Sequence, residues 1–287
     1  MSETPFILTL SCADTVGIVA AVSGFLAQRG GFIVESQQFA DRAAGRFFLR
    51  VAFIPAQGAV LEADALRAGF ADIATGFGMD WSLADSAVRP RILIAVSRFG
   101  HCLNDLLHRW RTGSLPVEIA GVVSNHDDLR SLVEWHGLPW HHIPVTPATK
   151  PAGEAALLDL MAAERVDLLV LARYMQVLSP ELSAALAWRC INIHHSFLPS
   201  FKGAAPYTQA WQRGVKLIGA TAHYVTGDLD EGPIIEQGST RVDHSHTAED
   251  MVRIGRDVEA QVLAYAVTWA AEQRILPNGR KTVVFRR

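Results

Sequence analysis

Beyond residue 90 the sequence alternates between short apolar runs and segments of helical length, with no internal repeat. The expected strands span 91–96, 118–123, 140–143, 168–171 and 190–193, and the expected helices span 104–111, 128–136, 153–164 and 248–271. Because parallel strands need long crossover connections, this alternation predicts a mostly parallel, doubly wound α/β sheet. Ligands of such sheets lie beyond the carboxyl ends of the strands.

The first third of the sequence has a different order: strand, helix, strand, strand, helix, strand. The expected elements span 6–11, 16–29, 32–41, 47–54, 60–70 and 79–83. Gly30 and Gly31 end the first helix, and the turn 42–45 joins two strands into a hairpin. This βαββαβ order is that of a ferredoxin-like domain.

A polar stretch that ends in proline separates the two patterns, so we expect domains 1–84 and 91–287 joined by a linker at 85–90. Near the end of the second domain, Asn278-Gly279 between Ile275 and Val283 predicts a terminal hairpin.

The overall composition excludes several classes of protein. The chain has 287 residues, 49% of them hydrophobic, and a formal net charge of −3, which gives no basic field for nucleic acid. The N-terminus shows neither a secretory signal nor a membrane span, so we expect a cytoplasmic protein. Three widely spaced cysteines, Cys12, Cys102 and Cys190, argue against a disulfide framework or a thiolate metal site.

The residues most indicative of chemistry follow the strand expected at 190–193. Asn192 and His194 are two apart, so on a strand they project from one face and offer two donors to one carbonyl oxygen. Asp230 follows the apolar segment 217–225, and a loop folding back over the strand would supply a base. A donor pair and a base suit attack on a carbonyl. The alternative is that Asn192 and Asp230 are turn residues and His194 a hydrogen-bonded core histidine.

The motifs around these residues resemble the active-site signature of the folate-dependent formyltransferase family. The matching residues are Asn192-Ile193-His194, Ser196, Leu198, Pro199, His223, Leu229-Asp230, Gly232 and Pro233. The second histidine, His195, and the segments 124–129 and 139–144 resemble the formyltetrahydrofolate deformylase branch, over residues 6 to 285. The resemblance implies catalytic roles for Asn192, His194 and Asp230.

The resemblance also implies a substrate and its binding residues. The substrate would be 10-formyltetrahydrofolate, hydrolysed to formate and tetrahydrofolate in one-carbon metabolism and purine biosynthesis, with folate as substrate and no cofactor. The implied substrate-binding residues are Met175, Gln176, Val177, Leu178, His223 and Gly232. From composition alone, the segment 172–180 is better explained as a packed connecting loop, and only the resemblance favours a substrate contact.

Near the N-terminus, residues 14–19 resemble the start of an ACT domain, a module that pairs between subunits and binds amino acids. The resemblance implies a homo-oligomer and an amino-acid effector near Asp14, Gly17 and Ile18. The alternative is that Asp14 merely caps the helix and Gly17 permits close packing.

Two further patterns bear on the chemistry. The turn 97–102 follows the first strand of the second domain but has one glycine and the bulky Phe99 and His101. In the transformylases that the chain resembles, this turn is rich in glycine and holds the acceptor's phosphate, so the resemblance implies water in place of a nucleotide acceptor. Neighbouring residues on a strand face opposite ways, so His194 and His195 cannot chelate together and His195 is expected to face away; we predict no catalytic metal. The remaining alternatives are a formyltransferase to an amine and an amino-acid-sensing protein with a degenerate catalytic domain.

Overall fold

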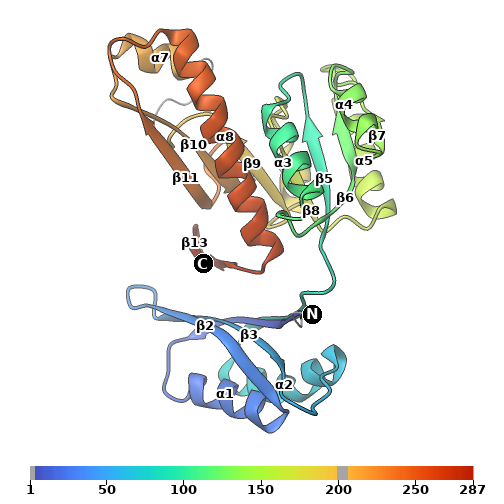
Figure 1. The fold of residues 1–287 in the computed structure, drawn as a ribbon, viewed down its shortest axis with the longest axis vertical. Helices are drawn as coiled ribbons and strands as arrows, with labels where there is room; N and C mark the ends of the chain where they lie inside the picture. Colours follow the sequence, from blue (N-terminus) through green and yellow to red (C-terminus); the bar gives the residue numbers. More distant parts are fainter. Residues whose placement is uncertain (1–3, 199–205, 287) are drawn as a thin grey trace. The chain divides into compact units, whose positions relative to one another are not determined.

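The computed structural model describes residues 4–198 and 206–286, and it divides into two compact units (Figure 1). The first unit comprises the residues up to Arg89 together with Glu272–Arg287, and the second comprises Pro90–Ala271. Pro199 of the sequence motif lies outside the described residues.

The first unit contains the βαββαβ order that the sequence predicted. Its elements are β1 (Phe6–Ala13), α1 (Ile18–Gln28), β2 (Gly31–Asp41), β3 (Arg46–Pro55), α2 (Ala63–Phe77) and β4 (Asp80–Asp85). The four strands form an antiparallel sheet in the order β2-β3-β1-β4. Helix α1 begins after Gly17, whose φ of 100° lies outside the helical region, and α2 runs past the predicted end until Gly78 stops it at a φ of 60°.

Strand β3 explains why this sheet is covered on both faces. Leu49, Val51 and Phe53 alternate along the strand and join the core formed with α1 and α2. Phe48 points to the opposite face, where it is fully buried against Leu276 and Phe285 from the C-terminus.

The C-terminal hairpin therefore belongs to the first unit, which corrects the predicted domain range of 91–287. The hairpin itself was predicted and is present as β12 (Ile275–Asn278) and β13 (Lys281–Val284). Besides covering Phe48, the segment supplies Arg274, whose Nη1 lies 2.9 Å from Glu35 Oε1. The hairpin lies against the sheet because Phe48 needs apolar contacts and Glu35 needs a cationic partner, and the C-terminal segment supplies both.

The second unit is built on a seven-stranded sheet in the order β11-β10-β9-β8-β5-β6-β7. Its elements are β5 (Arg91–Val96), α3 (His101–Arg111), β6 (Glu118–Ser124), α4 (Arg130–Trp135), β7 (Trp140–His142), α5 (Lys150–Ala163), β8 (Leu168–Leu171), α6 (Pro180–Ala185), β9 (Cys190–His194), α7 (Pro206–Gln212), β10 (Leu217–Tyr224), β11 (Ile234–Arg241) and α8 (Ala248–Ala271). Strands β7, β6, β5, β8 and β9 are parallel, and β10 is antiparallel to both of its neighbours. The mostly parallel sheet and the bounds of α8 agree with the prediction.

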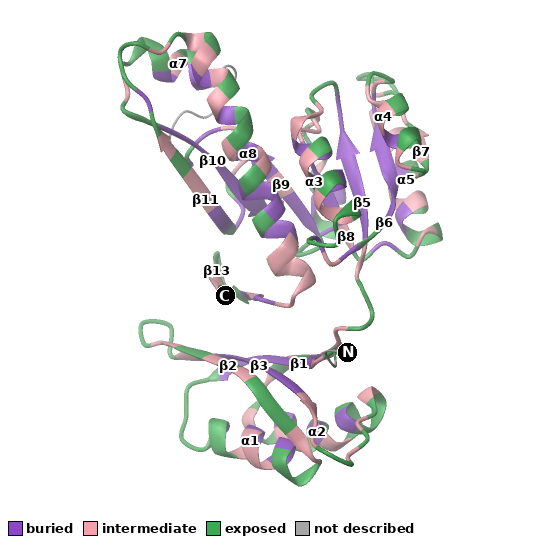
Figure 2. Cartoon of the chain, viewed as in Figure 1, coloured by how far each residue is buried: buried purple, intermediate pink, exposed green. Residues whose placement is uncertain are grey.

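Burial along β5 shows that both faces of this sheet are covered. Leu93 and Ala95 pack in one cluster with Leu157 and Met161 of α5. The residues that alternate with them on β5 are also fully buried, so the strand is purple along its length in Figure 2. Helices α3 and α8 pack against each other, and α8 lies across β9, β10 and β11.

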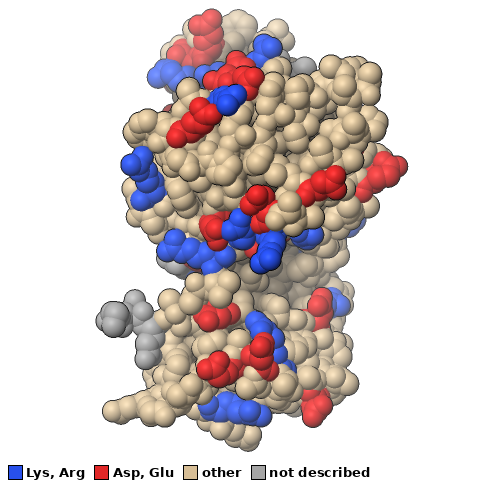
Figure 3. Space-filling view, turned by 90° about the vertical axis from the view of Figure 1, so that its right-hand side faces the viewer, with Lys and Arg blue, Asp and Glu red and all other residues tan. Residues whose placement is uncertain are grey.

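Two further properties of the described residues concern helix hydrophobicity and the distribution of charge. None of the described helices is long and apolar enough to cross a membrane. On the face drawn in Figure 3, basic and acidic side chains are interspersed in small groups, so this face offers no extended basic surface to a nucleic acid.

Candidate active site

A cavity of about 570 Å³ opens in the second unit beyond the carboxyl ends of β8 and β9. Its walls come from the segments that follow these strands, from the loop between β10 and β11, and from α7 and α8. The strand order reverses at this edge of the sheet, because the chain adds β6 and β7 on one side of β5 and then adds β8 on the other side. This is the position at which doubly wound sheets bind ligands, and the volume is typical of a small-molecule site.

Asn192 and His194 lie on one face of β9, as predicted, and both line the cavity. In the register with β10, Asn192 is opposite His223 and His194 is opposite Thr221. His194 is only 5% exposed, and β9 extends one residue beyond the predicted strand to include it. The strand therefore delivers an amide and an imidazole side by side.

Asp230 reaches this pair because the loop after β10 folds back over β9. Its Oδ1 lies 3.2 Å from His194 Nδ1 and 3.8 Å from His223 Nε2. The backbone at Asp230 is left-handed, with a φ of 56°. Aspartate tolerates this conformation better than most residues, but it still carries strain that often accompanies functional sites.

Gly232 makes the return of the loop possible. A Cβ at this position would lie 1.7 Å from the carbonyl oxygen of Tyr224, so only glycine fits against β10 here. Gly232 lies outside the cavity lining, and its placement indicates a packing role in place of the predicted substrate contact.

His223 fixes the orientation of Asn192. Its Nδ1 donates to the carbonyl oxygen of Tyr224 at 2.8 Å, so the neutral ring accepts at Nε2 from Asn192 Nδ2, 3.2 Å away. Burial lowers the pKa of His223, which favours this neutral form. The second amide proton of Asn192 is left for a ligand.

The electrostatics of the pair favour a charged Asp230. Burial raises the pKa of this carboxyl group, but the hydrogen bond and the electrostatic attraction from His194 outweigh it, so the pKa lies below its usual value. His194 Nε2 is buried and has no hydrogen-bond partner among the described residues. A buried nitrogen without a partner is costly unless a ligand satisfies it.

The predicted wall of the cavity is also in place, since Met175, Gln176, Val177 and Leu178 all line it. Met175 and Val177 are 50% and 56% exposed, so they present apolar surface at the opening. Ser97, which the sequence analysis did not single out, anchors this segment: its Oγ accepts from the Met175 backbone N–H at 3.1 Å and donates to Asn125 Oδ1 at 2.6 Å.

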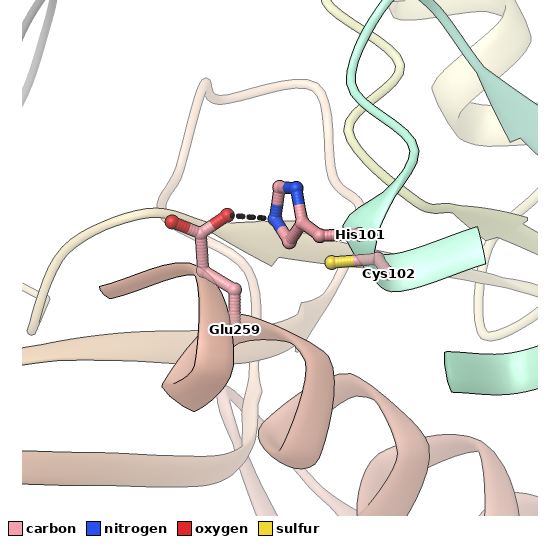
Figure 4. A group of neighbouring side chains, drawn as sticks. All are labelled: His101, Cys102 and Glu259. Atoms are coloured by element: carbon pink, nitrogen blue, oxygen red, sulfur yellow. Dashed lines mark hydrogen bonds and ion pairs between the residues drawn. The ribbon is translucent and has the colours of Figure 1, made fainter. Parts of the chain in front are cut away.

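A second polar group lies around Glu259 of α8, a residue that is 1% exposed (Figure 4). Tyr207 donates to Oε1 at 2.8 Å, His101 Nε2 lies 2.8 Å from Oε2, and Arg173 Nε lies 3.4 Å from Oε2. Burial raises the pKa of Glu259, but these partners more than compensate, so its pKa is lowered and the group is a carboxylate.

Cys102 lies beside this group, and its sulfur together with His101 and Glu259 forms a set of ligand-type atoms within 4.8 Å. Burial strongly raises the pKa of the Cys102 thiol, which opposes the thiolate that a metal would need. The contacts of Glu259 are those of an ion-pair network, and the predicted absence of a catalytic metal stays a prediction.

His195 departs from its predicted orientation. Strand β9 ends at His194, so the alternation of strand side chains does not extend to His195, and His195 lines the same cavity. Its ring centroid lies 5.2 Å from that of His194 and 6.3 Å from that of Tyr207. Burial lowers the pKa of His195 to about 4, so the ring is neutral at ordinary pH.

Sequence analysis missed the network around Glu259, although the sequence held a signal for it. Glu259 lies four residues from both Gly255 and Leu263, so it falls on the buried stripe of α8. An acidic residue at such a position needs partners, and here they come from α3, α7 and the segment after β8.

The predicted effector residues lie at the start of α1 in the first unit. Asp14 is exposed, and its backbone N–H donates to the Gly45 carbonyl oxygen at 3.0 Å. Gly17 adopts the positive φ noted above, and Ile18 is 2% exposed within the core. The Ile18 side chain is therefore committed to packing, and an effector would meet only its backbone.

Comparisons with known proteins agree with this geometry. Residues 90–267 match the family model of formyl transferases. The chain is 54% identical over 280 residues to a formyltetrahydrofolate deformylase of Corynebacterium sp. strain P-1, covering 98% of each chain. A crystal structure of a formyltetrahydrofolate deformylase from Burkholderia mallei superposes with a TM-score of 0.94 at 53% identity, covering 99% of this chain and 100% of the other.

More distant similarity is confined to part of the chain. A glycinamide ribonucleotide transformylase from Symbiobacterium toebii has a TM-score of 0.62 at 33% identity and covers 69% of this chain and 95% of the other.

Proposed function

The chain belongs to the formyltetrahydrofolate deformylase family, and we propose that its cavity removes the formyl group of 10-formyltetrahydrofolate through Asn192, His194 and Asp230. The chain is accordingly a hydrolase, with water as the acceptor of the formyl group. The observation that carries the mechanism is the unpaired, buried His194 Nε2 beside the charged Asp230.

The two donors would hold the formyl oxygen. The free amide proton of Asn192 and the Nε2 proton of an imidazolium at His194 converge on the oxyanion that forms when water attacks. Asp230 Oδ1 lies 3.2 Å from Nδ1, where its charge attracts the imidazolium of the transition state. Donors of this kind each contribute about 3 kcal/mol to transition-state stabilisation.

Asp230 would act as the base. Its carboxylate takes a proton from the attacking water as the oxygen–carbon bond forms, which gives a tetrahedral intermediate on the formyl carbon. When the carbon–N10 bond breaks, that proton passes to the departing nitrogen. The products are tetrahydrofolate and formic acid, which ionises to formate.

The network around Glu259 supports water over an amine acceptor. The turn after β5 places Phe99 in the cavity lining and His101 against Glu259. This leaves the bulky Phe99 ring in the space that a large acceptor such as a ribonucleotide would need. A rival assignment as an amine formyltransferase is therefore disfavoured.

The activity is tested by incubating chelator-treated protein with 10-formyltetrahydrofolate and no amine, and following formate. We expect formate and tetrahydrofolate in equal amounts. A strict need for an amine or for zinc would refute the assignment and the predicted absence of a metal. Lack of any release would favour the alternative of a sensing protein with a degenerate catalytic domain.

For the first unit we propose an ACT-type domain that assembles the enzyme and binds an amino acid. Strand β2 is an edge of the sheet, and Phe32, Val34 and Phe39 on it are 60%, 51% and 45% exposed. Exposed apolar edges of this kind favour pairing with a second copy. Residues 13–17 before α1 are exposed and no side chain of the described residues caps the helix, which supports an effector site near Asp14.

Assembly is tested in the full chain by Val34→Glu, with Val60→Glu as the control because Val60 is 82% exposed away from the sheet. We expect Val34→Glu alone to lower the mass in solution. An unchanged mass would contradict the assembly role of β2. Substitution of Asp14 by Ala should weaken the response of hydrolysis to amino acids, and an unaltered response would contradict the effector site.

A further inference from the structure

Arg173 lines the cavity with N–H donors that are unpaired among the described residues, and hydrolysis by Asn192, His194 and Asp230 does not account for them. The side chain is 10% exposed and lines the cavity, yet Nη1 and Nε have no hydrogen-bond partner among the described residues. A guanidinium offers five N–H donors, and leaving them unpaired away from water is costly.

The nearby carboxylate does not satisfy these donors. Glu259 lies 3.4 Å from Arg173 Nε, but its Oε1 already accepts from Tyr207 and its Oε2 faces His101 at 2.8 Å. Glu259 balances the charge of Arg173 without occupying the remaining edge of the guanidinium.

Two further features show that Arg173 is held in place. Its backbone is left-handed with a φ of 66°, which is uncommon for a residue with a long side chain. The guanidinium also packs over the ring of Phe99, 5.4 Å from the centroid, and Arg256 packs over the same ring at 5.5 Å. Both guanidinium groups belong to the cavity lining, as does the buried carboxylate of Glu259 on α8.

This site is linked to the catalytic residues by direct contacts. The ring of His195 lies between those of His194 and Tyr207, and Tyr207 binds Glu259, which pairs with Arg173. A small anion released at His194 therefore remains within the same cavity as Arg173.

We propose that Arg173 forms a binding site for a small carboxylate, and that its ligand in the reaction is the product formate. This identification rests on the proposed hydrolysis, which generates formate in the same cavity. A planar guanidinium edge matches a carboxylate through two parallel hydrogen bonds, and such charge-assisted pairs are the strong ones. The site takes formate from the oxyanion donors and holds it before release.

Binding is measured directly, without folate, by titrating sodium formate into ¹⁵N-labelled full-length protein and following arginine Nε–H resonances at constant ionic strength. We expect an arginine Nε resonance to shift with saturation in the millimolar range, and this resonance to be missing in Arg173→Lys. Arg173→Lys keeps the charge but loses the two-pronged geometry, so formate should bind at least about tenfold more weakly. The matched control is Arg253→Lys on α8, since Arg253 is 76% exposed.

Carboxylates on the folate substrate are the competing ligand, so the titration is repeated in saturating tetrahydrofolate. Retained formate binding supports a product site, whereas displacement of formate by tetrahydrofolate overturns it. The proposal also fails if no arginine resonance responds to formate in the wild type, a result that stands even if Arg173→Lys does not fold. Because these measurements need no turnover, loss of the hydrolase assignment would appear separately, in the formate-release assay.

Discussion

Replacing Asp230 by Asn separates the base from the rest of the cavity. The side chain keeps nearly the same volume and lies 3.2 Å from His194 Nδ1, so the pocket should still form. The substitution removes the charge that accepts the proton of water and that attracts the imidazolium of the transition state. We therefore expect hydrolysis to fail while folate binding is largely retained.

Two contributions determine the expected loss of rate: the attraction between Asp230 and His194, and the role of Asp230 as a base. At 3.2 Å and an effective dielectric constant of about 20, a carboxylate and an imidazolium attract each other by about 5 kcal/mol, most of which desolvation offsets. Loss of a general base costs about 10²–10⁴-fold in rate, or about 3–5 kcal/mol. We therefore expect the single-turnover rate of Asp230→Asn to be lower than that of the wild type by about 10²–10⁴-fold.

The assay is single-turnover formate release beside a tetrahydrofolate-binding titration. Asp257→Asn on α8 is the control, because Asp257 is exposed and lies outside the cavity lining. A near-normal rate in Asp230→Asn would refute the base role, although the family assignment would survive. A parallel loss of rate and folate binding would instead indicate that Asp230 shapes the pocket.

The remaining predictions concern donors, pH and packing. His194→Ala and Asn192→Ala should each lower the single-turnover rate by about 10²–10³-fold, and the double variant should lose far less than the product of the two, which rapid quench measures. Because the pKa of His195 is lowered to about 4, the unfolded chain binds more protons than the folded chain between pH 6.5 and 4, so stability is lost as pH falls through this window. His195→Gln should reduce that loss in denaturant titrations, and unchanged curves would contradict this expectation. Gly255→Ala would place a Cβ 2.1 Å from the Tyr207 ring and should cost about 1–3 kcal/mol of unfolding free energy, whereas Gly76→Ala, with open space around it, should be neutral or stabilising; equal melting temperatures would contradict the packing.

The sequence was sufficient where local rules decide structure. Alternation of apolar runs and helical segments predicted that the second sheet is mostly parallel, and the spacing of Asn192 and His194 placed both on one strand face. It was insufficient where long-range packing decides: the C-terminal hairpin was predicted as a hairpin, but its attachment to the first unit depends on Phe48 and Glu35, which are far away in sequence. His195 was misplaced because the prediction extended strand alternation one residue beyond the strand.

The cavity contains two polar groups whose residues are brought together in different ways. This difference explains why the sequence indicated the first group and not the network around Glu259. Asn192 and His194 lie on one strand and Asp230 lies in the loop after the neighbouring strand, so a motif in the sequence is enough to indicate them. The partners of Glu259 come from the start of α3, from α7 and from the segment after β8, so only the folded chain brings them together. In this protein the carbonyl chemistry is local in sequence, whereas the closure of the acceptor side and the orientation of Arg173 are properties of tertiary packing.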